Sequence, residues 1–335
     1  MTVKTFVKQA IRLPLEGLAA RFGEHTQKAK EPRLWILMYH RVLPQTDPRF
    51  EQEEPGMIVT PETLSMHLDT LKRHFELVSL TDWIERKQQG RPLPLKACAL
   101  TFDDGWLDNY QYALPVLEQH QAPATLFVVS HMMGTCEEFW PNRIAKLLLL
   151  PQDQLQSIDW LQDLVGRAGF SRETQAQTIY QLKSMPDNKI IELLNQTETR
   201  LNLTPTPTHS LMNWDQVQKM HQTGLVDIGS HTKYHVRLRA DVEPRVMGEE
   251  IIQSKDFIET KLGIDVKLFC YPNGDWCPSA RSIVQQHYLS AVTTQKGINV
   301  GSTKDFFTLP RMGVHEDCSL TKTKLLARLS NWPRT

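Results

Sequence analysis

The sequence has no excess of charge of either sign. Its 335 residues include 38 lysines and arginines and 38 aspartates and glutamates, so the formal net charge is zero. A protein that binds polyanions in general needs a surface on which one sign of charge predominates. The balance therefore argues against nucleic acid as a partner.

Cysteine is scarce, and its spacing has no framework pattern. The five cysteines are odd in number and include no Cys-x-x-Cys; they are Cys98, Cys136, Cys270, Cys277 and Cys318. Small secreted domains that depend on disulfides usually carry an even set of cysteines. The pattern predicts reduced thiols in a cytoplasmic protein.

Residues 1–22 lack a continuous apolar run, which argues against a signal peptide or a membrane span there. Basic residues alternate instead with apolar ones, as in a basic amphipathic helix. The basic positions are Lys4, Lys8, Arg12 and Arg21, and Pro14 interrupts the pattern. We therefore expect residues 1–30 to form a separate N-terminal segment. It either packs on its own domain or makes peripheral contact with the inner face of the membrane.

Apolar runs typical of buried strands alternate along the chain with helical patterns. We expect strands at Leu34–Tyr39, Leu77–Leu80, Ala97–Phe102, Thr125–Ser130, Leu225–Gly229, Val266–Tyr271, Leu289–Thr293 and Phe307–Val314. We expect helices near residues 61–75, 109–120, 214–223, 244–262 and 278–287. Such alternation predicts an α/β fold with a parallel sheet.

Residues 131–210 break this alternation. The stretch is rich in glutamine, contains no convincing strand, and has helical runs at Trp140–Leu150 and Thr174–Leu203. We interpret it as a helical insertion within one domain of residues 31–318, which a C-terminal helix or tail follows at 319–335. The insertion would lie on one side of the site, where it either holds the substrate or completes the fold.

Two adjacent carboxylates end one predicted strand, in the motif Thr101-Phe102-Asp103-Asp104-Gly105. Side chains alternate along a strand, so the two neighbours point in different directions. One can then bind a metal while the other transfers protons. Like charges this close also shift each other's pKa, which is typical of functional sites. The alternative is an exposed turn, because Asp and Gly are common turn residues.

Two histidines follow another predicted strand at a spacing of four, in Gly229-Ser230-His231-Thr232-Lys233-Tyr234-His235. On a helical turn this spacing would place both imidazoles on one face, where they can bind one cation. The pair alone is a weak signal in a chain with 12 histidines. Two imidazoles and one carboxylate, however, form a three-ligand site with a position open for water, which is typical of a catalytic metal.

Together, Thr-Phe-Asp-Asp-Gly and the later His-Thr-x-x-His resemble the polysaccharide deacetylase family, also called the NodB-homology or carbohydrate esterase 4 group. Further segments extend the resemblance over about residues 34–315: Leu37–Val42, Thr60–Leu80, Ala122–Phe127, Trp214, Gly224 and Phe269–Gly274. The resemblance implies a distorted (β/α)7 barrel of the polysaccharide deacetylase type, with its site at the carboxyl ends of the strands.

The resemblance also implies roles for the two motifs. Asp104, His231 and His235 would bind a divalent metal, usually zinc, with cobalt, nickel or iron as alternatives. Asp103 would be the general base that takes a proton from the attacking water. The metal would polarise the carbonyl of an N-acetyl group on a sugar. The products would be acetate and a free amine on the glycan.

The third motif, Phe269–Gly274, would line the substrate and its oxyanion. The backbone N–H of Asn273 would stabilise the oxyanion, with Tyr271 and Pro272 beside it. The better-known members of the family carry an arginine, which orients the catalytic aspartate, where this chain has Cys270. A branch with Phe-x-Tyr-Pro-x-Gly in this motif resembles the chain more closely.

Two roles therefore have no residue yet: the cationic partner of Asp103 and the donor of a proton to the leaving amine. The Leu-x-His that family members usually carry near the end of the domain is also absent. Thr308–His315 occupies about that place. We expect Arg311 to replace the missing arginine as the partner of Asp103, and His315 to donate a proton to the leaving amine. The alternatives are that Arg311 is a surface charge and His315 a loop residue.

His40 ends the first predicted strand, so its side chain can project into the same site. We expect it to line the substrate, because three ligands already suffice for the metal. The alternative is a structural histidine bonded to backbone. Tyr39 and Trp106 are expected to form walls of the site.

Three functional classes remain open. The first, which we favour, is a metal-dependent hydrolase that removes N-acetyl groups from a sugar of a glycan or of a lipid-linked saccharide precursor. The second is an amide or O-acetyl ester hydrolase with a non-glycan substrate. The third is a catalytically silent glycan-binding protein, which the missing arginine motivates. No local pattern identifies the sugar.

Overall fold

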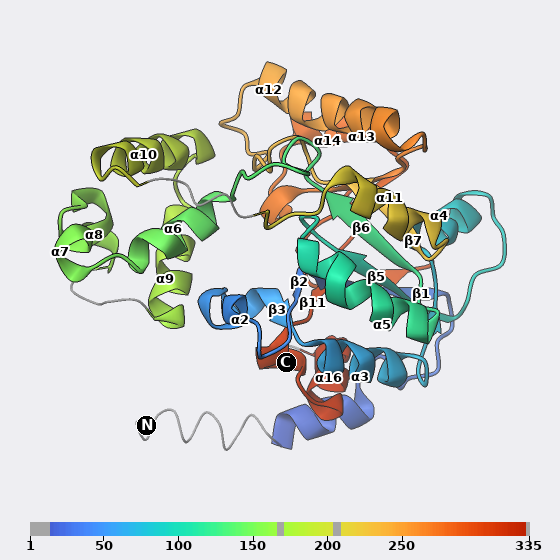
Figure 1. Ribbon diagram of the computed structural model, residues 1–335. Helices are drawn as coiled ribbons and strands as arrows, with labels where there is room; N and C mark the ends of the chain where they lie inside the picture. Colours follow the sequence, from blue (N-terminus) through green and yellow to red (C-terminus); the bar gives the residue numbers. More distant parts are fainter. Residues whose placement is uncertain (1–13, 166–170, 204–208, 333–335) are drawn as a thin grey trace.

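In the part of the chain that the structure describes, a curled sheet of nine strands organises the fold, and helices cover its outer face (Figure 1). The structure is a computed structural model that describes residues 14–165, 171–203 and 209–332. Its strands are β1 Arg33–Tyr39, β2 Arg41–Val42, β3 Ile58–Val59, β4 Glu76–Leu77, β5 Lys96–Phe102, β6 Ala124–Val128, β7 Val226–Ser230, β8 Leu268–Cys270, β9 Ser290–Val292, β10 Asn299–Val300 and β11 Met312–Gly313.

The α-helices surround the sheet and extend beyond it. They are α2 Pro48–Gln52, α3 Pro61–Leu71, α4 Leu80–Gln88, α5 Leu114–His120, α6 Trp140–Leu148, α7 Gln152–Gln156, α8 Asp159–Val165, α9 Arg172–Leu182, α10 Asp187–Arg200, α11 Trp214–Gln222, α12 Pro244–Gly248, α13 Ser254–Leu262, α14 Pro278–His287, α15 Glu316–Ser319 and α16 Lys322–Leu329. Short π-helical turns precede α5 and α13, at Asn109–Ala113 and Glu249–Gln253. Short 3₁₀ turns lie at Pro55–Met57 and Pro272–Gly274.

Parallel pairing connects the main strands in the order β1, β5, β6, β7, β8 and β9. The segment that ends in β11 then closes the ring. Leu309 bridges Val292 of β9, and Met312 pairs with Leu37 of β1. The predicted α/β fold with a parallel barrel-like sheet is confirmed. The predicted final strand is shorter than expected, but its residues perform the closure.

One predicted strand is partly wrong. The strand expected at Leu77–Leu80 ends at Leu77, and α4 begins at Leu80. Ser79 causes the change, because its hydroxyl accepts a hydrogen bond from the backbone N–H of Asp82 and so caps the helix.

Alternate residues of the strands fill the interior of the barrel. Leu34 and Ile36 of β1, Ala97 and Ala99 of β5, and Phe127 of β6 belong to one buried cluster. The same cluster includes Leu80, Trp83 and Ile84 of α4, which covers one end of the barrel. The intervening residues, such as Trp35 and Leu37, pack outward against helices. This alternation is the period of two that a strand imposes.

Close packing fixes the strand that leads to the histidine motif. A Cβ atom added at Gly229 in β7 would lie 2.4 Å from the ring of Phe127 in β6. Only glycine therefore allows β7 to approach β6 at this point. The backbone that carries His231 is positioned by this contact.

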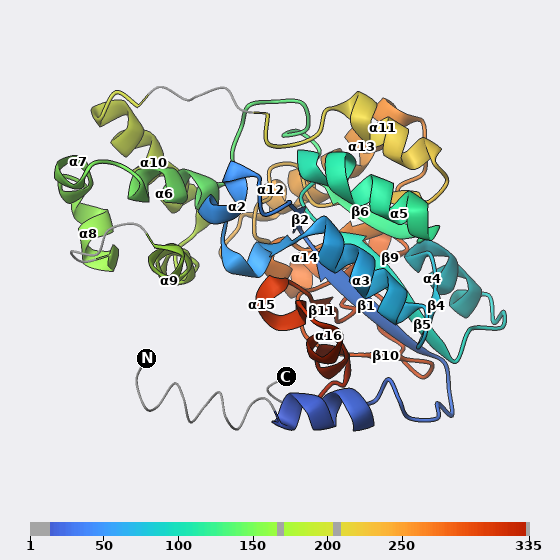
Figure 2. The same ribbon diagram turned by 60° about the horizontal axis from the view of Figure 1, so that its bottom comes forward.

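The helices α6 to α10 form a group beside the barrel, as both views show (Figures 1 and 2). They have a hydrophobic cluster of their own, which includes Ile144, Leu161, Ile179 and Leu194. The stretch predicted as helical at Thr174–Leu203 is helical, but it forms two helices. It is divided into α9 and α10, because Pro186 precedes α10 and cannot continue α9. The boundaries of the insertion at 131 and 210 stay a prediction.

A helix over residues 14–22 packs beside the C-terminal helix (Figure 2). Ala19 is fully buried, whereas Leu15, Leu18 and Phe22 are 48%, 48% and 51% exposed. Three of the basic positions expected in this segment fall within residues 1–13, outside the described residues. Among the described residues, no helix is both long and apolar enough to cross a bilayer. Contact with a membrane surface stays a prediction.

Candidate active site

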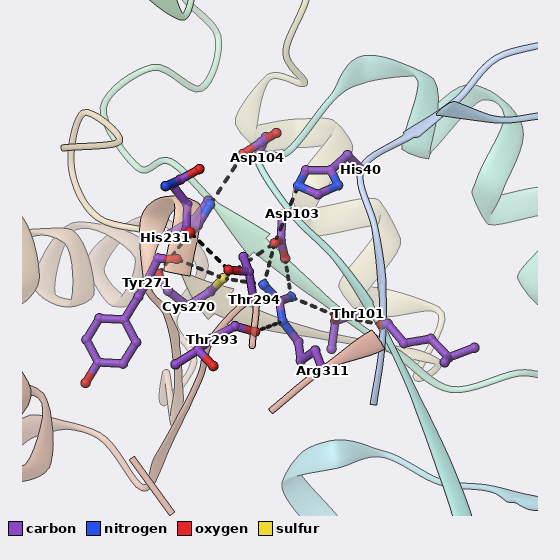
Figure 3. Close-up of polar contacts among 12 residues, drawn as sticks. His40, Thr101, Asp103, Asp104, His231, Cys270, Tyr271, Thr293, Thr294 and Arg311 are labelled. Carbon is purple, nitrogen blue, oxygen red and sulfur yellow. Dashed lines mark hydrogen bonds and ion pairs between the residues drawn. The ribbon is translucent and has the colours of Figure 1, made fainter. Parts of the chain in front are cut away.

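Side chains from several parts of the sheet meet at one end of the barrel (Figure 3). Asp103 and Asp104 follow β5, His231 follows β7, and Cys270 ends β8. Arg311 reaches the same place from the closing segment. The carboxyl ends of parallel strands lie at one edge of the sheet, so residues far apart in the sequence converge there.

Asp104 and His231 form a compact group of potential metal ligands together with His235. The Oδ1 atom of Asp104 lies 3.4 Å from Nε2 of His231 and 3.5 Å from Nε2 of His235. The three ligand atoms lie within 4.8 Å of one another. Both Asp104 and His231 are buried. The group has the nitrogen and oxygen donors that zinc and similar divalent metals prefer.

The protonation of His231 also suits a metal ligand. Its Nδ1 lies 2.8 Å from the backbone carbonyl of Cys270. A carbonyl oxygen only accepts, so Nδ1 must carry the proton and donate it. With Nδ1 committed to that bond, Nε2 is the ring atom that faces Asp104 and that would bind a metal. A second bond that fixes the tautomer in this way is typical of metal-binding histidines. The residues present therefore fit a divalent metal.

The histidine motif does not adopt the helical turn that was expected, so that prediction is wrong. Residues 231–235 form a loop in which Thr232 and His235 have φ angles of 67° and 61°. The carboxylate of Glu250 accepts hydrogen bonds of 2.9 Å from the backbone N–H groups of Lys233 and Tyr234. This distant side chain replaces the local bonds of a helix and folds the loop so that both imidazoles face Asp104.

Trp106 holds the carboxylate of Asp104 in place. Its indole Nε1 donates a hydrogen bond of 2.8 Å to Oδ2 of Asp104, which leaves Oδ1 to face the histidines. The guanidinium of Arg41 lies 4.2 Å from the centre of the indole and pairs with buried Asp108. Sequence reasoning treated Trp106 only as a wall. Its position two residues after Asp104 was the available signal for a role in orienting the ligand.

Asp103 and Arg311 form a buried bidentate ion pair. Nη1 and Nη2 of Arg311 each donate a hydrogen bond of 2.7 Å to the two carboxylate oxygens of Asp103. Arg311 is fully buried. It also donates to the hydroxyl of Thr101 and to the backbone carbonyl of Thr293, at 2.9 and 2.8 Å. The structure thus brings together the two residues that the sequence suggested as partners.

This arrangement keeps Asp103 ionised. Burial alone would raise the pKa of Asp103, but the charge of Arg311 and its two hydrogen bonds hold that pKa below its ordinary value of 3.8. Burial acts in the same direction on Asp104, whose pKa the two histidines nevertheless hold well below the usual range. Two ionised carboxylates therefore lie side by side, each with its own cationic or hydrogen-bonding partners.

Cys270 occupies the place next to this pair. Its Sγ lies 3.1 Å from Nη2 of Arg311 and 3.5 Å from Oδ2 of Asp103. Asp103, His231 and Cys270 also lie close enough to form a second set of metal ligands. The guanidinium of Arg311 would repel a cation there, and burial raises the pKa of the Cys270 thiol. The set of Asp104, His231 and His235 is therefore the better metal site.

The two candidate histidines for proton transfer lie in different surroundings. Nε2 of His40 is 3.8 Å from Oδ2 of Asp103 (Figure 3). His315 immediately precedes α15, and its Nδ1 is 3.8 Å from the carboxylate of Asp317. Among the residues that the structure describes, no hydrogen bond or ion pair joins His315 to the Asp103 carboxylate.

The third motif contributes backbone more than side chains. Asn273 has a left-handed φ of 56°, and the hydroxyl of Thr294 donates to its carbonyl at 3.0 Å. Pro272 is buried. Tyr271 is fully buried, and its ring lies 5.1 Å from that of Phe269 in the core. Its phenol points away from Asp103 and His231 (Figure 3), and a place for Tyr271 beside the substrate stays a prediction.

The orienting role of Trp106 predicts an effect on metal affinity. Trp106→Phe keeps an aromatic ring but removes the hydrogen bond to Asp104. We expect the dissociation constant for zinc to rise about 10- to 100-fold, as for other partners of ligating side chains. Competition with a chromophoric chelator measures it. Trp160→Phe is the matched control, because it removes an indole hydrogen bond of 2.9 Å within the helical group. Equal zinc affinity in both variants would contradict the assignment.

Comparisons with known proteins agree with this geometry. The chain is 24% identical over 202 residues to the poly-beta-1,6-N-acetyl-D-glucosamine N-deacetylase of Escherichia coli, a match that covers 60% of this chain but only 25% of that protein. It is 23% identical over 226 residues to the enzyme of the same name from Staphylococcus epidermidis, with 63% of this chain and 78% of that protein covered.

The solved structure of the Streptococcus pyogenes deacetylase PplD in complex with acetate has the same fold. The TM-score is 0.59 at 19% sequence identity, and the match covers 91% of this chain and 100% of that one. In sequence, the model of the family described as polysaccharide deacetylase matches residues 90–159 and 173–292. Because these two stretches make up more than half of its residues, the chain belongs to the polysaccharide deacetylase family.

Proposed function

We propose that this protein is a metal-dependent hydrolase that removes N-acetyl groups from a sugar of a glycan. The observation that carries the proposal is the buried Asp103–Arg311 pair beside the group of Asp104, His231 and His235. A base that is held ionised next to a metal site is what hydrolysis of an amide requires. By their names, two relatives act on poly-beta-1,6-N-acetyl-D-glucosamine, which makes oligomers of that sugar the first substrates to test.

Asp104, His231 and His235 would hold the metal, which when bound would polarise the acetyl carbonyl and make water more acidic. Asp103 accepts the proton of the attacking water at a carboxylate oxygen. Both of its oxygens already accept from Arg311, but each has a further lone pair. Arg311 fixes the plane of the carboxylate and keeps it ionised.

Two groups complete the reaction. The backbone N–H of Asn273 would donate to the oxygen that becomes negative when water attacks the carbonyl carbon. The C–N bond then breaks, acetate leaves, and the nitrogen needs a proton to depart as an amine. We propose His40 as the donor of that proton in place of His315, because of these two histidines it is His40 that lies beside Asp103.

A pair of variants distinguishes the two histidines. His40→Ala should lower kcat on N-acetylated oligosaccharides by about 10²- to 10⁴-fold, the usual contribution of a general acid. It should leave zinc content and the hydrolysis of 4-nitrophenyl acetate unchanged, since nitrophenolate departs without a proton. His315→Ala should retain activity on both substrates. The reverse pattern would return the role of proton donor to His315.

The reaction itself is tested by release of acetate. Wild type and Asp103→Asn, each stripped of metal and reloaded with zinc, are incubated with a panel of N-acetylated saccharides, simple amides and O-acetyl esters. We expect zinc-dependent release from saccharides and a loss of about 10²- to 10⁴-fold in the variant. Release only from simple amides or esters would favour the non-glycan hydrolase. Zinc binding without any release would favour a silent glycan-binding protein.

Lipid-linked saccharides in the same panel test whether the substrate is a lipid-linked precursor. A cytoplasmic location and a lipid-linked form of the substrate follow from the sequence alone and stay predictions.

A further inference from the structure

A cleft with a volume of about 840 Å³ lies between the helical group and the loop that carries His235. Helices α6 and α10 and the segment before α6 form one side, and residues 234–236 form the other. Figure 1 shows α6 and α10 in the helical group beside the barrel. The volume falls in the range of small-molecule binding sites. His235 lines the cleft, so the cleft is continuous with the metal site.

Hydrogen bonds and a ring contact hold the two walls of the cleft in place. Arg237, which is 3% exposed, pairs with Asp187 of α10 at 2.7 Å. It also donates to the backbone carbonyls of Lys183 and Met185 at 2.6 and 2.5 Å. On the other side, the ring of Phe139 lies 4.9 Å from that of His235. The cleft is therefore formed before any ligand binds, which lowers the entropic cost of binding.

Hydrogen-bonded ion pairs line the cleft. Arg143 of α6 donates two hydrogen bonds of 2.9 and 2.8 Å to Glu198 and one of 2.7 Å to Asn195. Lys146 pairs with Glu138 at 2.6 Å. Tyr234, beside the metal ligand His235, is 46% exposed and offers an aromatic surface. An aromatic surface with a few fixed polar groups suits a ligand rich in hydroxyl groups.

The charges of the side chains that line the cleft indicate which class of ligand it can bind. Among the described residues that line the cleft, five are carboxylates and two are lysine or arginine. Both of those cations, Arg143 and Lys146, are already paired with glutamates. A phosphate or another anion would need cations that are not committed. The cleft therefore suits a sugar chain that is neutral or carries amines.

We propose that this cleft binds the sugar units next to the one that is deacetylated, so that the helical group selects oligosaccharides over single sugars. The inference deepens the proposed function and rests on it. Asn195 and Tyr234 are the specificity-determining residues. Asn195 accepts from Arg143 through its oxygen, and its amide nitrogen has no protein partner within the described part of the chain. That nitrogen can donate to a hydroxyl group of the ligand.

The test compares substrates of different length. We measure kcat/KM of the zinc-loaded full chain on N-acetylglucosamine oligomers from the disaccharide to the hexasaccharide. In wild type kcat/KM should rise with length. Asn195→Ala and Tyr234→Ala should each lower it about tenfold on the hexasaccharide, the effect of one lost contact, and by less than about twofold on the disaccharide. Gln196→Ala is the matched control, because Gln196 is the exposed neighbour on α10 whose side chain donates to Glu192 within the same helix.

A binding measurement separates this inference from the proposed function. Isothermal titration of the oligomers into metal-free Asp103→Asn needs no turnover. Affinity that rises with length in this protein, and falls when Asn195→Ala is added, supports the cleft even if no substrate releases acetate. Equal losses on short and long oligomers, or no dependence on length in wild type, would overturn it whether or not acetate is released.

Discussion

The ion pair between Asp103 and Arg311 is the interaction on which the site depends. Two opposite charges are fully removed from water, so each requires the other: loss of one partner from a buried pair typically costs about 3–5 kcal/mol. Arg311 comes from the segment that closes the barrel, and its Nε donates to Thr293 just after β9. The pair therefore links β5 to the closing seam. The contacts of Arg311 therefore serve both to close the sheet and to orient the base Asp103.

The metal site is built in the same manner, by partners that lie outside it. A backbone carbonyl sets the tautomer of His231, an indole holds Asp104, and the carboxylate of Glu250 shapes the loop of His235. Phe139, at the start of α6, packs on His235. The helical group is thus in contact with a metal ligand. A change in that group can reach the site without touching Asp103.

Much of the fold and of the candidate site could be predicted from local patterns in the sequence. The alternation of apolar runs predicted the parallel sheet, and the two motifs predicted which carboxylates and histidines meet, because strand ends share one edge. The shape of the histidine loop could not be predicted, because it depends on Glu250, a partner distant in sequence. The spacing of Trp106 two residues after Asp104 allowed the hydrogen bond between them but did not specify it. The inward or outward direction of Tyr271 likewise depends on where β8 ends, which its short apolar run does not specify.

The central claim is that Asp103 requires one buried cation as its partner. Moving the arginine from position 311 to position 270 tests this claim most directly. Arg311→Ala should lose about 10²-fold in kcat for acetate release while it keeps bound zinc, since Asp103 loses the partner that orients it. The double variant Arg311→Ala/Cys270→Arg places a guanidinium where other family members carry one, in the space that Arg311 leaves beside Cys270. If one buried cation for Asp103 is what the site requires, the double variant should recover at least about tenfold. Two folded, zinc-loaded variants of equally low activity, or full activity in Arg311→Ala alone, would contradict it.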